Sequence, residues 1–186
     1  YRIDGQSFRT HSFETLREVE NYDAIETIDA KNIGLTEFPH VLPLGIKRLL
    51  LEFNNIKVVN ADLSKYSQLV KVDLNYNAIE YLNIISNTIE TLWILGNTNT
   101  VQIVRLPSSL KSFAMNFKTV SELLKVAELF DGTDTIDEFA GYNNAEENEE
   151  PENIEIEFNS ITDLIEQIES LSMRNPYVDE FVATRG

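Results

Sequence analysis

The sequence predicts an α/β repeat fold, in which short strands recurring about every 20 residues stack into a parallel sheet. Three observations predict it. The pattern apolar-x-x-apolar-x-apolar-x-x-Asn occurs three times in the middle of the chain, two weaker copies flank it, and both ends carry apolar residues at helical spacing. The 186 residues are enough for one domain, and a hydrophobic content of 42% is enough for a core.

The three complete copies begin at Ile46, Leu69 and Ile89, and the weaker ones begin at Ile25 and Leu110. Each copy is a short strand whose alternation directs apolar side chains to one face. Successive fourth positions are 21, 23, 20 and 21 residues apart, namely Ile28, Leu49, Val72, Leu92 and Phe113. One such strand cannot bury its apolar face alone, so we expect these five residues to stack side by side.

An asparagine follows each complete copy, at Asn54, Asn77 and Asn97, and Asn159 takes the same place after a later strand. A side-chain amide at this position can bond the open backbone groups of its own turn and of the neighbouring turn. We therefore expect a structural asparagine ladder. The alternative is that these are ordinary turn residues.

Taken together, the copies resemble the leucine-rich repeat family over about residues 25–120. The Leu-Pro steps at Leu42-Pro43 and Leu106-Pro107 resemble the short repeats of bacterial leucine-rich-repeat effectors. The resemblance implies a solenoid with a parallel β-sheet on its concave face. Some bacterial relatives join such repeats to a ubiquitin-ligase domain that acts through a cysteine, and this chain has no cysteine, which excludes that activity.

Both ends of such a stack need polar caps. Phe13, Leu16 and Val19 recur at helical spacing and predict a helical N-terminal cap within residues 1–24. Residues 113–124 and 154–165 resemble each other at an offset of 41, and each reads as a strand followed by an amphipathic helix. We expect a β/α C-terminal cap, with a last strand at 154–158 and a covering helix at 161–172, inside an acidic region 121–186.

Residues 131–153 are open to two interpretations. Ile136-x-x-Phe139 could supply a strand, but Phe139 lies too close to Ile154 for a full repeat, so the segment is a partial repeat or a protruding loop. It ends in an acidic run, which is either a solvated loop or a docking element for a basic partner. The run contains Glu146, Glu147, Glu149, Glu150 and Glu152.

Charge is concentrated in the last third of the chain. The net charge is −16, and residues 119–186 hold 18 acidic against 3 basic residues. Such a surface repels nucleic acid and anionic lipid and favours a protein partner with a basic surface. We expect no direct nucleic-acid binding and no membrane association. With no signal peptide or membrane-spanning segment in the sequence, we expect a cytoplasmic protein.

No pattern in the sequence indicates catalysis. The two histidines have no third ligand nearby, and phosphate-binding loops and nucleophile motifs are absent. We expect no enzyme, and no catalytic, cofactor-binding or metal-binding residues.

The outward positions of the repeated strands form the candidate binding face. Trp93 and Leu95 are apolar where solvent is expected, and exposed aromatic residues at the centre of a patch are typical of binding hot spots. An aromatic row that includes Tyr76 either joins this face or packs under the neighbouring turns. The predicted partner-binding residues are Leu50, Asp73, Tyr76, Trp93, Leu95 and Glu155.

The favoured function is a non-catalytic protein–protein interaction module that binds a protein partner through the concave face, as an inhibitor or an effector would. One alternative is an acidic decoy that occupies the nucleic-acid-binding site of another protein. Another is a structural subunit of a larger assembly such as a virion.

Overall fold

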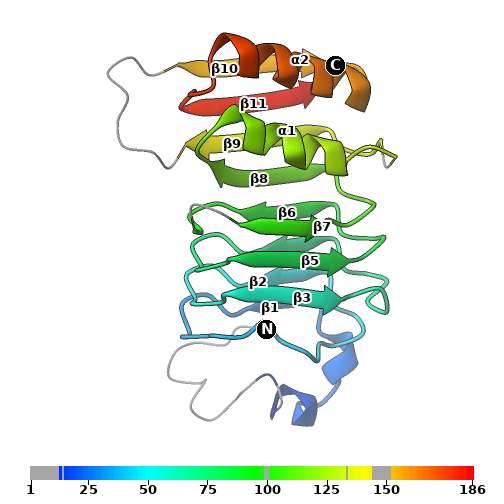
Figure 1. Cartoon of the computed structure of the whole chain (residues 1–186). Helices are drawn as coiled ribbons and strands as arrows, with labels where there is room; N and C mark the ends of the chain where they lie inside the picture. Colours follow the sequence, from blue (N-terminus) through cyan, green and yellow to red (C-terminus); the bar gives the residue numbers. More distant parts are fainter. Residues whose placement is uncertain (1–12, 14, 99–100, 133, 144–151) are drawn as a thin grey trace.

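The computed structural model describes residues 13, 15–98, 101–132, 134–143 and 152–186. They form two sheets and two α-helices, which confirms the α/β class (Figure 1). The large sheet contains, in spatial order, β1 (Thr27–Asp29), β2 (Arg48–Leu50), β4 (Lys71–Asp73), β6 (Thr91–Ile94), β8 (Ser112–Phe117), β9 (Glu138–Asn143), β11 (Glu180–Arg185) and β10 (Asn153–Phe158). The small sheet contains β3 (Val58–Asp62), β5 (Tyr81–Ile85) and β7 (Gln102–Arg105).

The first five strands of the large sheet pair in parallel and in the register that the sequence pattern predicts. Their fourth-position residues are register partners and are fully buried, namely Ile28, Leu49, Val72, Leu92 and Phe113. The apolar residues two positions after them also point into the core, as strand alternation requires.

The core lies on one side of the large sheet. Figure 1 shows the small sheet in front of the lower strands and the helices α1 (Val120–Leu129) and α2 (Ile161–Arg174) in front of the upper strands. Neither helix is long and apolar enough to cross a membrane, within the part of the chain that the structure describes. The opposite face of β2, β4, β6 and β8 carries no covering element among the described residues, and we call it the open sheet face.

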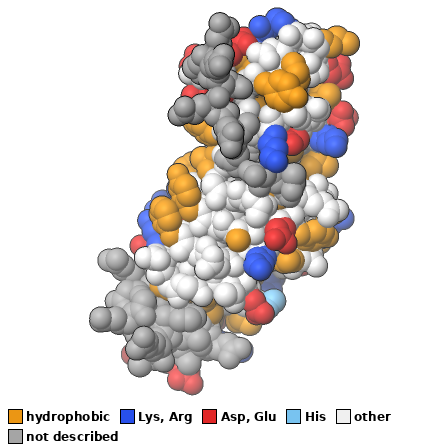
Figure 2. Space-filling model, turned by 60° about the vertical axis from the view of Figure 1, so that its left-hand side comes forward, with side chains coloured by type: hydrophobic (Ala, Val, Ile, Leu, Met, Phe, Trp, Pro, Cys, Tyr) orange, Lys and Arg blue, Asp and Glu red, His pale blue; other side chains and the backbone are white. Residues whose placement is uncertain are grey.

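A view from the side of the molecule shows exposed hydrophobic side chains in several separate groups among charged ones, not in one continuous patch (Figure 2). The groups differ in the elements that hold them. An apolar group therefore has to be judged by its own surroundings in the fold.

The N-terminal cap differs from its prediction. In place of one α-helix within residues 1–24, the described residues form two short 3₁₀ turns, η2 (Thr15–Glu18) and η3 (Tyr22–Ala24). Phe13 and Leu16 are buried as the helical spacing indicates. Asn21, with φ of 59°, adopts a left-handed conformation that ends any continuous helix at this point.

Residues 131–153 contain a strand, so the segment is not simply a loop. β9 pairs in parallel with β8, and Phe139 is the register partner of Phe113. The predicted strand and helix at the C-terminus are present as β10 and α2. A further strand, β11, which the pattern analysis did not predict, lies between β9 and β10 and runs antiparallel to β9.

The C-terminal part consists of two similar βαβ units, β8-α1-β9 and β10-α2-β11. The strands β8 and β10 and the helices α1 and α2 begin 41 residues apart, and β9 and β11 begin 42 residues apart. The third elements also share sequence, since Ile-Asp-Glu-Phe-Ala-Gly at 136–141 corresponds to Val-Asp-Glu-Phe-Val-Ala at 178–183. This second match is the signal that would have predicted β11.

The two units face each other across β9 and β11. Ala140 pairs with Val182, its own counterpart, and the flanking pairs Gly141–Phe181 and Phe139–Ala183 exchange places when the units are interchanged. α1 and α2 pack side by side on the same face. An approximate two-fold axis therefore passes between Ala140 and Val182, and β8 and β10 are equivalent outer strands.

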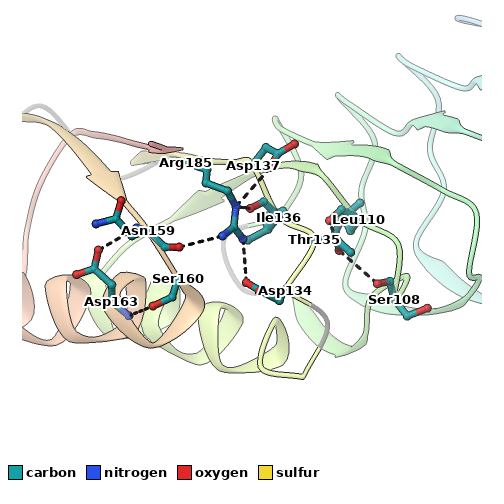
Figure 3. A network of polar contacts seen from close by, with 10 residues as sticks. All are labelled: Ser108, Leu110, Asp134, Thr135, Ile136, Asp137, Asn159, Ser160, Asp163 and Arg185. Atoms are coloured by element: carbon teal, nitrogen blue, oxygen red, sulfur yellow. Dashed lines mark hydrogen bonds and ion pairs between the residues drawn. The ribbon is translucent and has the colours of Figure 1, made fainter.

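Equivalent hydrogen bonds close the ends of the central strands. The Asn143 side chain donates to the carbonyls of Lys118 and Val178. At the equivalent place, the Arg185 guanidinium donates to the carbonyls of Asn159 and Ile136 (Figure 3). Arg185 in addition pairs with two carboxylates of the segment before β9, those of Asp134 and Asp137.

Candidate interaction face

The centre of the open sheet face is a row of one outward residue from each of four neighbouring strands. Leu50 on β2 and Trp93 on β6 are half-buried, whereas Asp73 on β4 and Ala114 on β8 are buried. Trp93 is the register partner of both Asp73 and Ala114. The strands thus bring predicted residues from three repeats into one surface.

Trp93 is held in place by its two neighbours. The Lys71 ammonium lies 4.2 Å from the centre of the indole ring, and the indole N–H donates to the Ser112 hydroxyl at 3.2 Å. The ring is therefore fixed by contacts from β4 and β8 and keeps only part of its surface in solvent. It is less exposed than the sequence analysis expected, because alternation fixes the face of a side chain but not the neighbours that lie over it.

Two carboxyl groups meet beside this tryptophan. Burial raises the pKa of Asp73 above its ordinary value, and the backbone N–H of Asn75, which donates to its Oδ1 at 3.0 Å, opposes that rise. Burial, followed by the nearby charge of Asp73, raises the pKa of Glu52, and Lys31 opposes this from 3.4 Å.

The raised pKa values of the Glu52–Asp73 pair favour protonation of one of the two carboxyls. One oxygen of Glu52, Oε1, is buried and has no donor among the described residues. A protonated carboxyl beside an ionised one satisfies both, since it donates one hydrogen bond and removes one of two like charges. The pair was not predicted, although Asp73 was. The sequence signal for this pair does not lie at equivalent positions of two repeats. Glu52 occupies the position of Asn75 in the preceding copy of the pattern, two positions after the one equivalent to Asp73.

An aromatic stack borders the face. Phe53 and Tyr76 are each 54% exposed, and their rings are parallel with centres 4.8 Å apart. Both have a positive φ, as does Gly96 at the next equivalent position. A Cβ at Gly96 would lie within 3.0 Å of the Tyr76 ring, so the stack fits only because this position is glycine.

The aromatic row therefore divides into two kinds of residue. Phe117 and Phe158 are fully buried, which fits the interpretation that the row packs inside the fold. Phe53 and Tyr76 are exposed, which fits the interpretation that it joins the binding face. Leu95 is half-buried, and its backbone N–H donates to the Asn75 side chain at 2.7 Å.

The asparagines behind the face form a connected row. Asn77 donates to the carbonyls of Leu51 and Leu74. Asn54 shares the first of these acceptors and Asn97 shares the second. Each carbonyl thus accepts from two successive asparagines, which fixes the spacing of the turns that hold the aromatic stack.

Asn159 does not belong to this row, contrary to the prediction. It is exposed, its N–H donates to Asp163 and its carbonyl accepts from Arg185. The reason is that β10 is followed directly by α2, so the backbone groups at this point are used in starting a helix.

The predicted residues of the acidic third are not part of the central site. Glu155 lies on β10, four strands from Trp93, which is about 19 Å at ordinary strand spacing. Glu146, Glu147, Glu149 and Glu150 lie outside the described residues.

Glu152, predicted as part of an acidic surface, is engaged in the fold. Its carboxylate accepts a hydrogen bond from the Asn175 side chain and pairs with Arg174 at 2.9 Å, and these two bonds lower its pKa. Its carbonyl accepts from the N–H of Asp179 at the start of β11. Glu152 therefore anchors the second βαβ unit.

No protein-family model matches the chain, and no curated protein matches its sequence.

Proposed function

We propose that the protein is a non-catalytic interaction module of the leucine-rich repeat kind, with the open sheet face as the concave face of a solenoid. The complete copies of the pattern, the in-register stacking of their strands and the shared asparagine bonds support this proposal. In this proposal the ligand is another protein, and the module acts in the cytoplasm as an inhibitor or an effector.

One observation carries the proposal. Apolar and aromatic surface gathers at one place, where Leu50 and Trp93 are half-exposed beside the more exposed stack of Phe53 and Tyr76. Rigid aromatic residues of this kind contribute most of the binding energy at protein interfaces. Lys71 and Ser112 hold Trp93 in one orientation, so little side-chain entropy is lost on binding.

The partner should carry basic side chains. Asp73 is buried and Glu52 half-buried next to the apolar surface, and most of the excess negative charge lies in residues 119–186. A lysine or arginine of a partner placed against the pair would take the place of the shared proton. The acidic third would speed association by steering a basic surface toward the face.

The test is capture of partners from native lysate followed by mass spectrometry, with the unaltered chain, Trp93→Ala and Tyr76→Ala. We expect both variants to lose the same partner, with a loss of about tenfold or more in affinity once it is purified. Tyr177→Ala is the matched control, because Tyr177 is equally exposed at 58% but lies at the far end of the molecule, after α2.

The acidic-decoy alternative predicts a different result, and the net charge of −15 in residues 119–186 is the observation that favours it. A decoy would keep its partner in both aromatic variants and lose it steeply as salt is raised, because its contacts are exposed charges. A partner with that behaviour would overturn the proposed use of the open sheet face.

A further inference from the structure

β10 is the last strand of the large sheet, and among the described residues no strand pairs with its outer edge. The carbonyls of Glu152 and Phe158 accept from the β11 side, at Glu180 and Gly186. The backbone N–H and C=O groups of successive residues point to opposite sides of a strand. The groups of the odd-numbered residues between Glu152 and Phe158, such as Glu155, therefore point away from β11. The edge therefore offers backbone donors and acceptors to an added strand.

The approximate two-fold symmetry relates the outer edge of β10 to the outer edge of β8, which already has a partner strand. β10 is the equivalent of β8, and the outer edge of β8 pairs in parallel with β6. Ser112, the counterpart of Asn153, donates its N–H to the carbonyl of Glu90 just before β6. The same kind of edge is thus filled by a parallel strand in one unit and lacks a strand in the other.

Side chains of β10 are less buried than their counterparts on β8, as expected if β10 lacks a neighbouring strand. Phe113 and Met115 of β8 are buried at 0% and 5% exposure, whereas their counterparts Ile154 and Ile156 are only partly buried. The two isoleucines line a groove of about 470 Å³ between β10 and α2, which Leu171 also borders. A strand beside β10 would cover them as β6 covers Phe113 and Met115.

Charge selects the occupant. Glu155 and Glu157 occupy the other face of β10, and Glu166 and Asp163 border the groove. The nearby cations are already engaged, since Arg174 pairs with Glu152 and Arg185 with Asp134. Directly opposed like charges destabilise strand pairs and opposite charges stabilise them, so an acidic strand is disfavoured here.

We propose that the outer edge of β10 binds an extended segment of a basic partner protein as an added parallel strand, with apolar side chains toward Ile154 and Ile156 alternating with lysine or arginine toward Glu155 and Glu157. This site is separate from the open sheet face. Pairing ends near Glu157, because the Gln167 side chain donates to the carbonyl of Glu157 at 2.9 Å and occupies the edge there.

The test uses the full chain and a capped peptide of alternating lysine and valine, measured by isothermal titration calorimetry. In a parallel ladder, Glu155 bonds the peptide residues on either side of its register partner. Their side chains point to the core side of the sheet, so these residues are the valines. We expect N-methylation of the valine amides to weaken binding by about tenfold or more, and N-methylation of the lysine amides to have little effect. The two peptides have the same composition and charge, so equal affinities would overturn the proposal.

Two protein variants complete the test. Glu155→Lys should abolish peptide binding, and Glu80→Lys, the same change of charge at an exposed site remote from β10, should preserve it. Absence of binding to the unaltered chain would overturn the proposal. So would a concentration-dependent dimer in analytical ultracentrifugation that excludes the peptide, because the edge would then belong to a second copy.

Discussion

At the scale of single residues, the asparagines show how a short pattern specifies a position in three dimensions. Asn54 is 6% exposed and uses its whole amide, accepting from the N–H groups of Ile33 and Leu35 and donating to the carbonyls of Ala30 and Leu51. No backbone ladder reaches these groups, so the side chain replaces it.

Asn54→Ala should lower the free energy of unfolding by about 2–4 kcal/mol, because the N–H groups of Ile33 and Leu35 and the carbonyl of Ala30 lose their bonds to this side chain. Urea denaturation measures this change. The matched control is Asn55→Ala, since Asn55 is adjacent and exposed, and it should change stability by less than about 0.5 kcal/mol. Equal effects of the two substitutions would contradict the structural role of the asparagine row.

The Glu52–Asp73 pair makes stability depend on pH in a stated direction. Burial raises the pKa of both groups in the folded chain. Their contribution is fully present below the ordinary pKa of about 4 and is lost as pH rises through the raised pKa, because the folded pair must then ionise.

Asp73→Asn keeps an acceptor for the Asn75 N–H and removes one of the two charges. As pH rises above about 4, this variant should lose less stability than the unaltered chain in thermal denaturation. Asn55→Ala, at an exposed position that carries no charge, should leave the pH dependence as it is. A variant with an unaltered pH profile would show that the pair does not share a proton.

At the scale of elements, both helices begin with the same device. The Glu122 carboxylate accepts from the N–H of Lys118 before α1, and the Asp163 carboxylate accepts from the N–H of Asn159 before α2. In α2 the Ser160 hydroxyl also accepts from the N–H of Asp163 at 3.1 Å, which completes a reciprocal cap.

Ser160→Ala should therefore cost about 1 kcal/mol of stability, the usual value of an N-cap. Ser170→Ala is the control, because Ser170 is exposed within the same helix, where alanine is the better helix former. Chemical denaturation of the two variants should give opposite signs. A neutral Ser160→Ala would indicate that the Asp163 carboxylate alone starts α2.

The elements that the sequence predicted are those whose apolar positions repeat in one frame. The strands holding Leu49, Val72 and Leu92 could be predicted because one residue in two faces a core. The small sheet could not, because β3 and β7 bury few side chains and leave apolar ones exposed, as at Val58 and Val104. β11 could have been predicted only by comparing residues 178–183 with residues 136–141, because no pattern within its own segment indicates a strand.

For the candidate site, the sequence predicted only which face of the sheet the side chains lie on. Strand alternation placed Trp93 and Leu50 on the outward face. The Lys71–Trp93 contact, the Glu52–Asp73 pair and the exposure of Phe53 depend on neighbouring strands and on a positive φ. These features follow from packing across repeats and not from spacing within one repeat.

At the scale of the whole molecule, the excess negative charge of the C-terminal part lowers the stability of the folded state. Residues 119–186, with a net charge of −15, form most of the two βαβ units, whereas residues 1–118 are nearly neutral. Like charges at this density repel one another across the sheet and the helices, and dissolved salt screens that repulsion.

The melting temperature should therefore rise by several degrees as sodium chloride is raised from about 20 mM to about 0.5 M. Differential scanning calorimetry measures it directly. Glu166→Lys, which reduces the excess charge on the exposed face of α2, should make the melting temperature less sensitive to salt. A melting temperature that falls with salt would show that the ion pairs of Arg174 and Arg185 outweigh the repulsion.

The axis between Ala140 and Val182 gives the C-terminal part the form of a symmetric homodimer, with both halves on one chain. In a true homodimer, one codon specifies both copies of every residue, and a change in it alters the assembly twice. Once the copies are joined in tandem, each side is free to diverge. Asn143 and Arg185 differ in this way, since an amide and a guanidinium bind equivalent carbonyls. The two outer strands differ likewise, because β8 pairs with β6 whereas β10 carries Glu155 and Glu157.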